Sequence, residues 1–313
     1  MDKESEYAIV GGGPAGIVFH NELINRFPKA DIVLFEKGEF LCSDVSTYGR
    51  FVRNHGVDDI TKWDFLTEGN YYGLQVSNFF QGKFTGKVLY TGISKITKVG
   101  EVCQLLTITG ETYLTKRVIL ATGVRLKEIE AIENLSNQKF NISSISTEEL
   151  KTIDFSNFEL ILIGSGDKTL LKAIRIAKHL EENSSHLPYT PITILVKDRF
   201  TENANPEFLK EIKLYIKTGL IQVITNCWQI EVVKLMENNM VHQIISRQGE
   251  YSVKAPQGAY LGVFIGFEGR IPELINCDIN DFVCVGDLAL ALDKKKINIT
   301  AALLDAERKA RDI

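Results

Sequence analysis

A glycine-rich segment close to the start of the chain constrains the fold more than any other feature. It runs Ile9-Val-Gly-Gly-Gly-Pro-Ala-Gly-Ile-Val18, and its glycines at 11, 13 and 16 have the G-x-G-x-x-G spacing. In that pattern one glycine makes a tight turn, one lets backbone N–H groups approach a diphosphate, and one allows a helix to pack closely on a strand. The segment therefore predicts a nucleotide diphosphate site.

The residues around this turn support the same interpretation. Residues 7–10 predict a short strand, residues 17–27 a helix, and residues 31–35 a second strand. The N-terminus of such a helix attracts anions, because its first N–H groups lack partners within the helix. Glu36 directly follows the second strand and comes 20 residues after Gly16. A carboxylate at this spacing binds ribose hydroxyl groups in dinucleotide-binding folds. The plain alternative is a glycine-rich turn in an ordinary α/β domain.

Length and charge narrow the class of protein. A chain of 313 residues is long enough for two domains, each with a core of its own. Its 36 basic and 40 acidic residues are scattered and its net charge is −4, so nothing favours nucleic-acid binding. Residues 1–6 are mostly charged and lead into the first strand, and no apolar run is long enough for a membrane span. We expect a cytoplasmic protein.

The glycine turn and the segments that follow it occur a second time. Phe158-Glu-Leu-Ile-Leu-Ile-Gly-Ser-Gly166 predicts a buried strand and a turn, followed by a helix over 168–180 and a strand over 192–196. In each copy β-rich segments come next, ending in an apolar strand with glycine, at Val118–Gly123 and Val263–Gly266. The sequence predicts an α/β fold of two Rossmann-like nucleotide-binding domains.

This duplicated plan, with Ala121-Thr-Gly123 closing its first copy, resembles the pyridine nucleotide–disulfide oxidoreductase family, in its low-molecular-weight thioredoxin reductase branch. The resemblance implies two three-layer ββα domains, the second inserted in the first. It implies an FAD-binding domain of residues 1–125 and 255–313, an NAD(P)H-binding domain of residues 126–254, and a homodimer.

The resemblance also implies residues for each cofactor. Asp287 in Phe282-Val-Cys-Val-Gly-Asp-Leu288 matches the aspartate that holds the ribityl chain of FAD, Asn54 matches an asparagine near the flavin, and Lys296 lies in a segment facing it. The expected FAD-binding residues are Gly11, Gly13, Pro14, Ala15, Gly16, Glu36, Lys37, Asn54, Ala121, Thr122, Gly123, Gly286, Asp287, Lys296 and Ile297. Those expected for NAD(P)H are Gly164, Gly166, Asp167, Lys168, Lys197 and Arg199.

The chain departs from the family at the dithiol. Thioredoxin reductases carry a C-x-x-C pair just before the second glycine turn, whereas residues 141–150 here hold no cysteine. Dithiol exchange needs an attacking and a resolving sulfur, so dithiol reductase chemistry is excluded at this position. Ferredoxin or flavodoxin–NADP reductases and bacillithiol disulfide reductases, which resemble this arrangement, also lack the pair.

The second glycine motif is altered as well. Thr169 stands where a small residue is expected, and Lys168 where serine is usual. Lys197 and Arg199 suit the 2′-phosphate of NADPH, but Asp198 between them repels it. NADPH, NADH and a domain that binds neither all remain open.

Two residues are candidates for catalysis. The five cysteines form no C-x-x-C pair and the five histidines no ligand spacing, so no metal site is expected. Cys42 lies shortly after Glu36, and there NADH peroxidases and coenzyme A disulfide reductases, which this chain resembles, hold one cysteine that cycles through a sulfenic acid or mixed disulfide. The resemblance therefore implies a redox-active Cys42, whose thiolate the nearby helix terminus would stabilise. The plain alternative is a small buried hydrophobic residue. His55 follows Asn54.

Three functions follow from these observations. The first is an FAD-dependent NAD(P)H oxidoreductase whose acceptor is a ferredoxin or flavodoxin, a quinone, oxygen or a small metabolite. The second is a flavin-binding sensor or partner protein that has lost turnover. The third is a single-cysteine reductase of peroxides or mixed disulfides that uses Cys42.

Overall fold

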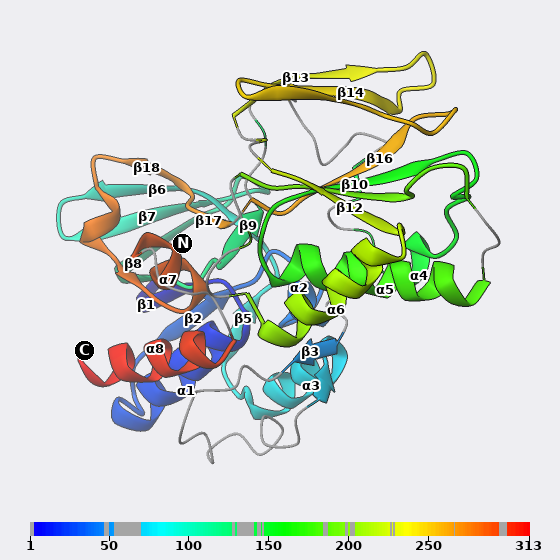
Figure 1. Ribbon diagram of the computed structural model, residues 1–313. Coiled ribbons are helices and arrows are strands. Elements are labelled where there is room, and N and C mark those ends of the chain that lie inside the picture. Colours follow the sequence, from blue (N-terminus) through cyan, green and yellow to red (C-terminus); the bar gives the residue numbers. More distant parts are fainter. Residues whose placement is uncertain are drawn as a thin grey trace. The chain divides into compact units, whose positions relative to one another are not determined.

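The computed structural model describes residues 3–46, 50–52, 70–126, 129, 141–142, 145, 147–183, 187–197, 200, 204–225, 227, 229–265, 267–293 and 299–313. The chain divides into two compact units, and the second interrupts the first (Figure 1). Unit 1 comprises Met1–Arg125 and Glu268–Ile313, and unit 2 comprises Leu126–Phe267.

The chain returns to unit 1 later than the sequence suggests. We expect the return after residue 254, but the structure places it after Phe267. The reason is the strand β16 (Ala259–Val263), which pairs with β10 (Glu159–Ile163) and so belongs to the second sheet. The strands β9 (Val124–Leu126) and β17 (Phe267–Gly269) pair with each other where the chain passes between the units.

Unit 1 is built on an eight-stranded sheet in the order β18-β6-β7-β8-β1-β2-β5, with β19 paired to β8. Its strands are β1 (Lys3–Val10), β2 (Ile32–Phe35), β5 (Lys87–Leu89), β6 (Ile93–Val99), β7 (Val102–Thr107), β8 (Thr112–Leu120), β18 (Glu273–Ile275) and β19 (Val283–Cys284), with a separate hairpin of β3 (Arg50–Val52) and β4 (Asn70–Tyr72). Its helices are α1 (Pro14–Arg26), α2 (Ser43–Ser46), α3 (Gly73–Lys83), α7 (Asp287–Leu292), α8 (Ile299–Arg311) and the 3-10 helix η3 (Ile279–Asp281).

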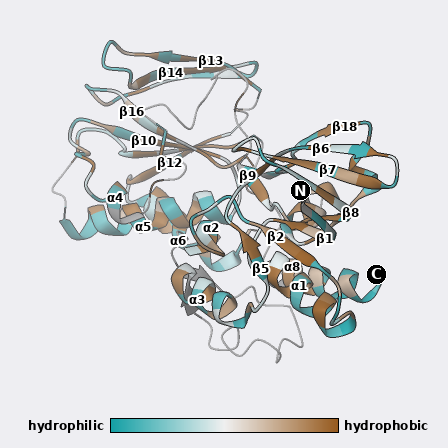
Figure 2. Cartoon of the chain, turned by 180° about the vertical axis from the view of Figure 1, so that it is seen from behind, coloured by the Kyte–Doolittle hydropathy of each residue, from teal (hydrophilic) through white to brown (hydrophobic). Residues whose placement is uncertain are grey.

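Side chains of the central strands of unit 1 alternate between two cores. Ile9 and Leu34 lie in the core shared with α1, α3 and α8, whereas Val10 and Phe35 lie in the core shared with the β6–β8 meander. Both faces of β1 and β2 are thus buried, as is typical of parallel strands covered on each side. Figure 2 shows the hydrophobic residues concentrated on these strands. This gives the three layers of the expected ββα arrangement.

Unit 2 repeats the plan with a sheet in the order β12-β11-β10-β16-β14-β13, with β15 paired to β14. Besides β10 and β16 its strands are β11 (Ile192–Leu195), β12 (Ile221–Ile224), β13 (Ile230–Leu235), β14 (Val241–Ser246) and β15 (Gly249–Ser252). Its helices are α4 (Thr147–Leu150), α5 (Asp167–Asn183) and α6 (Pro206–Lys217). Strand β10 runs parallel to both β11 and β16, and α5, with one apolar face, packs against α6. The α/β class and the two Rossmann-like units are confirmed.

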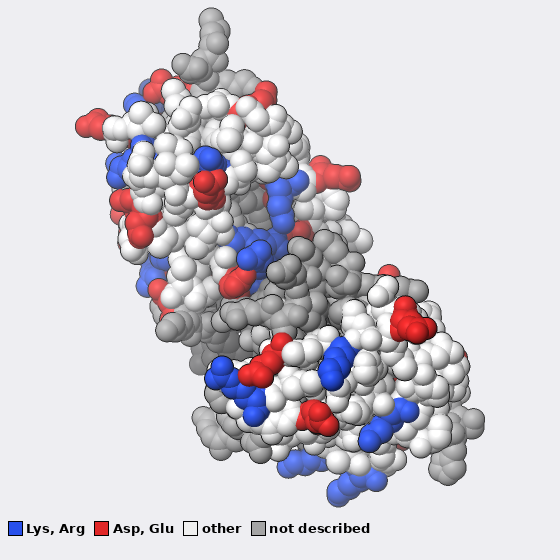
Figure 3. All heavy atoms as spheres, turned by 90° about the horizontal axis from the view of Figure 1, so that it is seen from above, with Lys and Arg blue, Asp and Glu red and all other residues white. Residues whose placement is uncertain are grey.

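Two properties of the surface and the helices bear on function. On the face seen in Figure 3, basic and acidic side chains are interspersed, without a large patch of one sign. Among the described residues, no helix combines the length and the hydropathy that crossing a membrane requires.

Candidate functional site

The first glycine turn brings helix α1 close to strand β1. Gly11 has a φ of +114°, a conformation that residues with a side chain rarely adopt, and its N–H donates to Phe35 O at 2.8 Å. A Cβ on Gly16 would overlap the carbonyl oxygen of Gly11. Both glycines are therefore required by the backbone, which presents the start of α1 at the carboxyl end of β1.

Gly13 leaves an open approach to the helix N-terminus. It is the N-cap of α1 and gives no side-chain acceptor to the first N–H groups, and Pro14 follows it. A Cβ built on Gly13 would have no neighbour within 4 Å. An anion placed there meets N–H groups and the positive end of the helix dipole, so the turn fits the diphosphate of FAD.

Glu36 is buried at the end of β2 and is tied to the turn. Its Oε2 accepts a hydrogen bond of 2.8 Å from Gly12 N, and its Oε1 accepts one of 2.6 Å from Gly38 N. A carboxylate has about four lone-pair positions, so two remain for ribose hydroxyl groups. Lys37, next in the chain, is exposed, with its Nζ 3.5 Å from Asp44 Oδ2.

Two further expected segments converge on the same edge of the sheet. Ala121 N donates to Val10 O at 2.8 Å, so residues 121–123 leave β8 beside the glycine turn. Val285 N donates to Leu120 O at 2.9 Å, and the Cα of Gly286 faces the side chain of Ala15. Asp287 then begins α7 with its Oδ1 buried. The turn, residues 121–123 and residues 286–287 thus surround one end of β1, as an FAD site requires.

Arg270 joins this site, and local sequence patterns do not reveal it. Its backbone oxygen accepts a hydrogen bond from Thr122 Oγ1, and its Nη1 forms an ion pair with Asp44. Burial by itself would raise the pKa of Asp44, but the hydrogen bond and charge of Arg270 and the charge of Lys37 lower it below its usual value. Because Arg270 is far from both partners in the chain, only the fold brings the three together.

Cys42 is in an environment that disfavours a thiolate. It is buried, its N–H donates to Gly12 O at 2.9 Å, and its Sγ lies 3.5 Å from the same oxygen. Burial, and secondly the charge of Glu36, raise the pKa of the thiol well above its ordinary value. A reactive cysteine needs the opposite shift, so the described geometry favours the alternative in which Cys42 is a packing residue.

The second glycine turn has the same backbone plan with altered side chains. Gly164 has a φ of +139°, and its N–H donates to Leu195 O at 3.0 Å. Thr169 is fully buried, and its Oγ1 has no hydrogen-bond partner in the described part of the chain. Asp167 Oδ1 accepts a hydrogen bond of 2.7 Å from Asn205 N. The turn is therefore tied to the start of α6.

Basic residues lie near this turn. Lys168 at the start of α5 and Lys197 after β11 are both exposed. Lys172, which the sequence interpretation missed, is mostly buried: its Nζ donates to Ile142 O at 3.1 Å and to Ile145 O at 2.5 Å. Burial, and secondly the charge of Lys168, lower its pKa to about 8. In the sequence, Lys172 is an ordinary lysine about one turn into a predicted helix, so no local pattern indicates these contacts.

Several expected site residues lie outside the described residues: Asn54, His55, Arg199, Lys296 and Ile297. Within the described ranges no three His, Cys, Asp or Glu residues form a group that could hold a metal ion.

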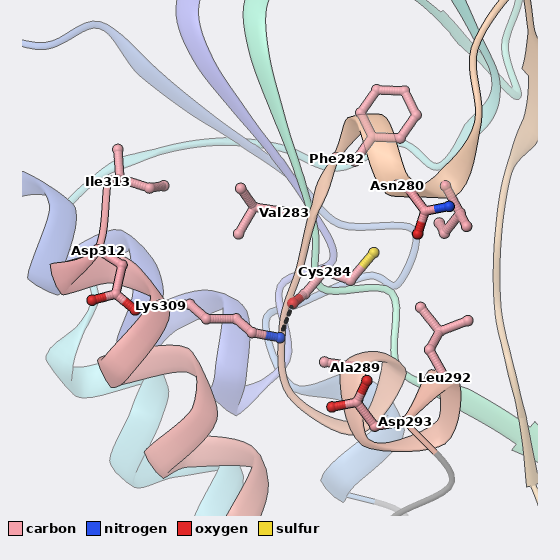
Figure 4. Close-up of a pocket in the computed structure, with 11 residues that line it drawn as sticks. Asn280, Phe282, Val283, Cys284, Ala289, Leu292, Asp293, Lys309, Asp312 and Ile313 are labelled. Carbon is pink, nitrogen blue, oxygen red and sulfur yellow. Dashed lines mark hydrogen bonds between the residues drawn. The ribbon is translucent and has the colours of Figure 1, made fainter.

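A separate pocket of about 420 Å³ lies in unit 1 between η3, β19, α7 and α8 (Figure 4). Phe282, Leu292 and Ile313 line it, and Lys309 Nζ donates to Cys284 O at 2.8 Å. Burial raises the pKa of the Cys284 thiol to about 11. None of the residues expected to bind a cofactor lines this pocket.

Comparisons with known proteins place the chain in a family. Residues 5–274 match the model of the family described as pyridine nucleotide-disulphide oxidoreductase. No curated protein matches the chain in sequence.

Solved structures share its fold at low sequence identity. The bacillithiol disulfide reductase Bdr of Bacillus cereus has a TM-score of 0.74 at 15% identity, covering 99% of this chain and 98% of its own. The same enzyme from Staphylococcus aureus has a TM-score of 0.72 at 14% identity, with the same coverage. The thioredoxin reductase of T. acidophilum has a TM-score of 0.66 at 14% identity, covering 99% of this chain and 97% of its own. The chain therefore belongs to the pyridine nucleotide-disulphide oxidoreductase family of flavin-dependent enzymes, and it shares its fold with thioredoxin reductases.

Proposed function

We propose that this protein is an FAD-dependent NAD(P)H oxidoreductase that passes electrons to an acceptor other than a dithiol. The observation that carries the proposal is the open, uncapped start of α1 at Gly13, with the carboxylate of Glu36 bonded to the same turn. An anionic diphosphate and a ribose are the groups that such a pair of sites selects.

Each part of unit 1 has a task in this proposal. The N–H groups at the start of α1 hold the diphosphate, Glu36 holds the adenosine ribose, and Asp287 orients the ribityl chain. When bound, the flavin supplies the two-electron and one-electron chemistry that side chains lack. The Arg270–Asp44 ion pair keeps the segment after Glu36 against residues 122–123.

Unit 2 is the proposed site of the nicotinamide donor. Lys168 and Lys197 provide exposed positive charge at the carboxyl ends of β10 and β11, which favours a phosphorylated dinucleotide. We therefore propose that the protein prefers NADPH to NADH as its electron donor. The ratio of kcat/KM for the two donors tests this order, and a ratio that favours NADH would reverse it.

We infer the electron acceptor from the names of the similar structures and by excluding the thiol chemistry that this chain's cysteines do not support. The similar structures include enzymes named bacillithiol disulfide reductase and thioredoxin reductase. This chain has no cysteine in residues 141–150, and Cys42 is buried with a raised pKa. A ferredoxin or flavodoxin, a quinone, oxygen or a small metabolite remains as acceptor. The homodimer and the cytoplasmic location expected from the sequence are part of this proposal.

Anaerobic rapid mixing tests the function directly. Purified holoprotein is mixed with NADPH or NADH, and the flavin absorbance near 450 nm is followed. We expect bleaching with at least one donor and recovery on adding the right acceptor. A protein that holds FAD but is bleached by neither donor would contradict the oxidoreductase.

A flavin-binding sensor is the second candidate, and one observation favours it. At the second glycine turn, Thr169 fills the position of a small residue and Asp167 is bonded to Asn205. Both features depart from the first glycine turn, which has Pro14 and Gly16 at the matching positions. Absence of bleaching together with unchanged FAD content is the result that this candidate predicts.

A further inference from the structure

Ile142 lies beside strand β16 in unit 2. Its N–H donates to Leu261 O at 2.8 Å, its side chain is fully buried, and Asn141 forms an isolated parallel bridge with Leu261. Ile145 N then donates to Ile142 O at 3.1 Å, which closes a tight turn. The backbone around Ile142 is therefore attached to β16 on one side, and the carbonyl groups of Ile142 and Ile145 remain for a donor from elsewhere.

The ammonium group of Lys172, on α5, joins these two carbonyl groups to an aromatic ring. Lys172 Nζ donates to Ile142 O at 3.1 Å and to Ile145 O at 2.5 Å, and it lies 5.4 Å from the centroid of the Phe264 ring. Carbonyl oxygens and the face of an aromatic ring both attract a cation. One charged group therefore holds together α5, the turn at Ile142 and the residue that follows β16.

Phe264 borders the second glycine turn. Its N–H donates to Ile163 O at 2.7 Å, and a Cβ built on Gly164 would lie 2.5 Å from Phe264 O. The backbone of Phe264 is thus one wall of this turn. A displacement of Phe264 would change the space that the turn leaves for a dinucleotide.

The link through Lys172 depends on its charge. Burial, and secondly the charge of Lys168 on the same helix, lower the pKa of Lys172 to about 8, whereas Glu149 on α4 raises it. Among the described residues, α6 and β16 contribute no charge that shifts it further. Above this pH the side chain becomes a neutral amine, which is a weaker donor to carbonyl groups and is not attracted to the ring as a cation is.

We propose that Lys172 is a positioning residue for the nicotinamide donor: its ammonium group fixes Phe264 and the backbone around Ile142, and so sets the shape of the second glycine turn that receives the dinucleotide. This inference rests on the proposed function, in which unit 2 binds NADPH or NADH. Donor affinity should therefore be highest while Lys172 is charged. Flavin content should not depend on Lys172, because the FAD site is built from unit 1.

Donor affinity measured as a function of pH tests the role of the charge. Flavin-loaded protein is mixed anaerobically with NADPH or NADH, and the donor dissociation constant and the limiting rate of flavin reduction are taken from the dependence on donor concentration. In the natural protein we expect the dissociation constant to rise about fivefold as the pH increases through about 8, with the limiting rate within about twofold. Lys172→Arg stays charged over this range and should show no such rise. Lys178→Met, at an exposed position of the same helix, should follow the natural curve.

A neutral variant measures what the ammonium group contributes. Lys172→Met removes the charge and the hydrogen bonds but keeps a side chain of similar length. At about pH 7 it should bind the donor about five- to tenfold more weakly than the natural protein, with natural flavin content and no further change with pH. Lys172→Arg should restore the affinity. A role in packing alone would lower the thermal midpoint of Lys172→Met without changing donor affinity, and that result would overturn the assignment.

The outcomes separate this inference from the function on which it rests. If neither donor reduces the flavin of the natural protein, the proposed function fails, and the role of Lys172 fails with it. If the flavin is reduced but donor affinity stays constant through about pH 8, or falls equally in Lys172→Arg, only the role of Lys172 fails. These pH profiles require only the natural protein and Lys172→Arg, so they decide the question even if Lys172→Met does not fold.

Discussion

Glu36 Oε2 accepts a hydrogen bond of 2.8 Å from the backbone nitrogen of Gly12, inside the diphosphate turn. Its other oxygen accepts one of 2.6 Å from Gly38 N. One buried carboxylate therefore fixes the turn after β1 and the turn after β2 in relation to each other. Glu36, which is expected to bind ribose, also holds the loop that is expected to bind the diphosphate. A change at Glu36 should therefore affect both parts of the site.

Replacing Glu36 should damage both stability and flavin binding. In Glu36→Gln one acceptor oxygen becomes an NH₂ group that faces a backbone N–H, so one buried donor stays unpaired. We expect the free energy of unfolding to fall by about 1–3 kcal/mol, and the purified protein to carry less flavin. Urea denaturation and the ratio of absorbance at 450 and 280 nm measure the two effects. Glu39→Gln, an exposed neighbour, is the control and should change neither.

Replacing either of two glycines of the same turn by alanine should affect different properties: flavin binding in one case and folding in the other. Gly13 has a φ of −74° and open space at its Cβ position, so Gly13→Ala should fold with natural stability. Its methyl group would occupy the approach of the diphosphate, and bound flavin should be lost. Gly16→Ala would overlap Gly11 O and should lower the thermal midpoint or prevent folding. Full flavin content in Gly13→Ala would show that the diphosphate does not lie at this turn.

Local patterns predicted much of the fold because the relevant residues are close in the chain. The turn at 11–16, its flanking strand and helix, and Glu36 lie within one βαβ unit. The end of unit 2 depends instead on β16 pairing with β10, which is about a hundred residues earlier. A local pattern predicts an apolar strand ending near Gly266 but not the strand with which it pairs. Local patterns therefore predict the return to unit 1 too early.

The residues of the candidate site likewise divide into those that local motifs predict and those that only the fold brings together. The glycine turn and residues 121–123 were found from motifs, but Arg270 was not, because its ion pair with Asp44 joins residues 226 positions apart. Cys42 illustrates the reverse case. Its place in the chain suggested an activated thiol, and only the fold reveals the burial that raises its pKa.

Cys42 should be dispensable for turnover. Because burial raises the pKa of its thiol, iodoacetamide at about pH 8 should label Cys42 in the folded protein far more slowly than a free thiol, whereas partly exposed Cys277 should label first. Cys42→Ser should keep its flavin and oxidise NAD(P)H within about twofold of the natural rate. Peptide mass spectrometry and steady-state assays check the two expectations. Loss of peroxide or mixed-disulfide turnover in this variant would restore the single-cysteine reductase.

A buried polar network holds one end of the sheet in unit 2. Glu159 is fully buried and accepts hydrogen bonds from the hydroxyl groups of Thr193 and Tyr251 and, at 3.1 Å, from Lys254 N. Gln222 Nε2 donates to Thr193 Oγ1 at 2.7 Å and to Tyr251 OH at 3.0 Å. Burial raises the pKa of Glu159 more than these hydrogen bonds lower it.

Stability should therefore fall as pH rises through the titration of Glu159. Between the ordinary value of 4.5 and the raised pKa, the folded state binds more protons than the unfolded state, so the free energy of unfolding decreases with increasing pH. Glu159→Gln lacks this titration, and its unfolding free energy should decrease less over the same range. Urea denaturation from about pH 4.5 to about pH 7 measures both slopes. Glu231→Gln, an exposed carboxylate of β13 in the same sheet, should match the natural slope. Parallel curves for the natural protein and Glu159→Gln would show that Glu159 does not titrate in this range.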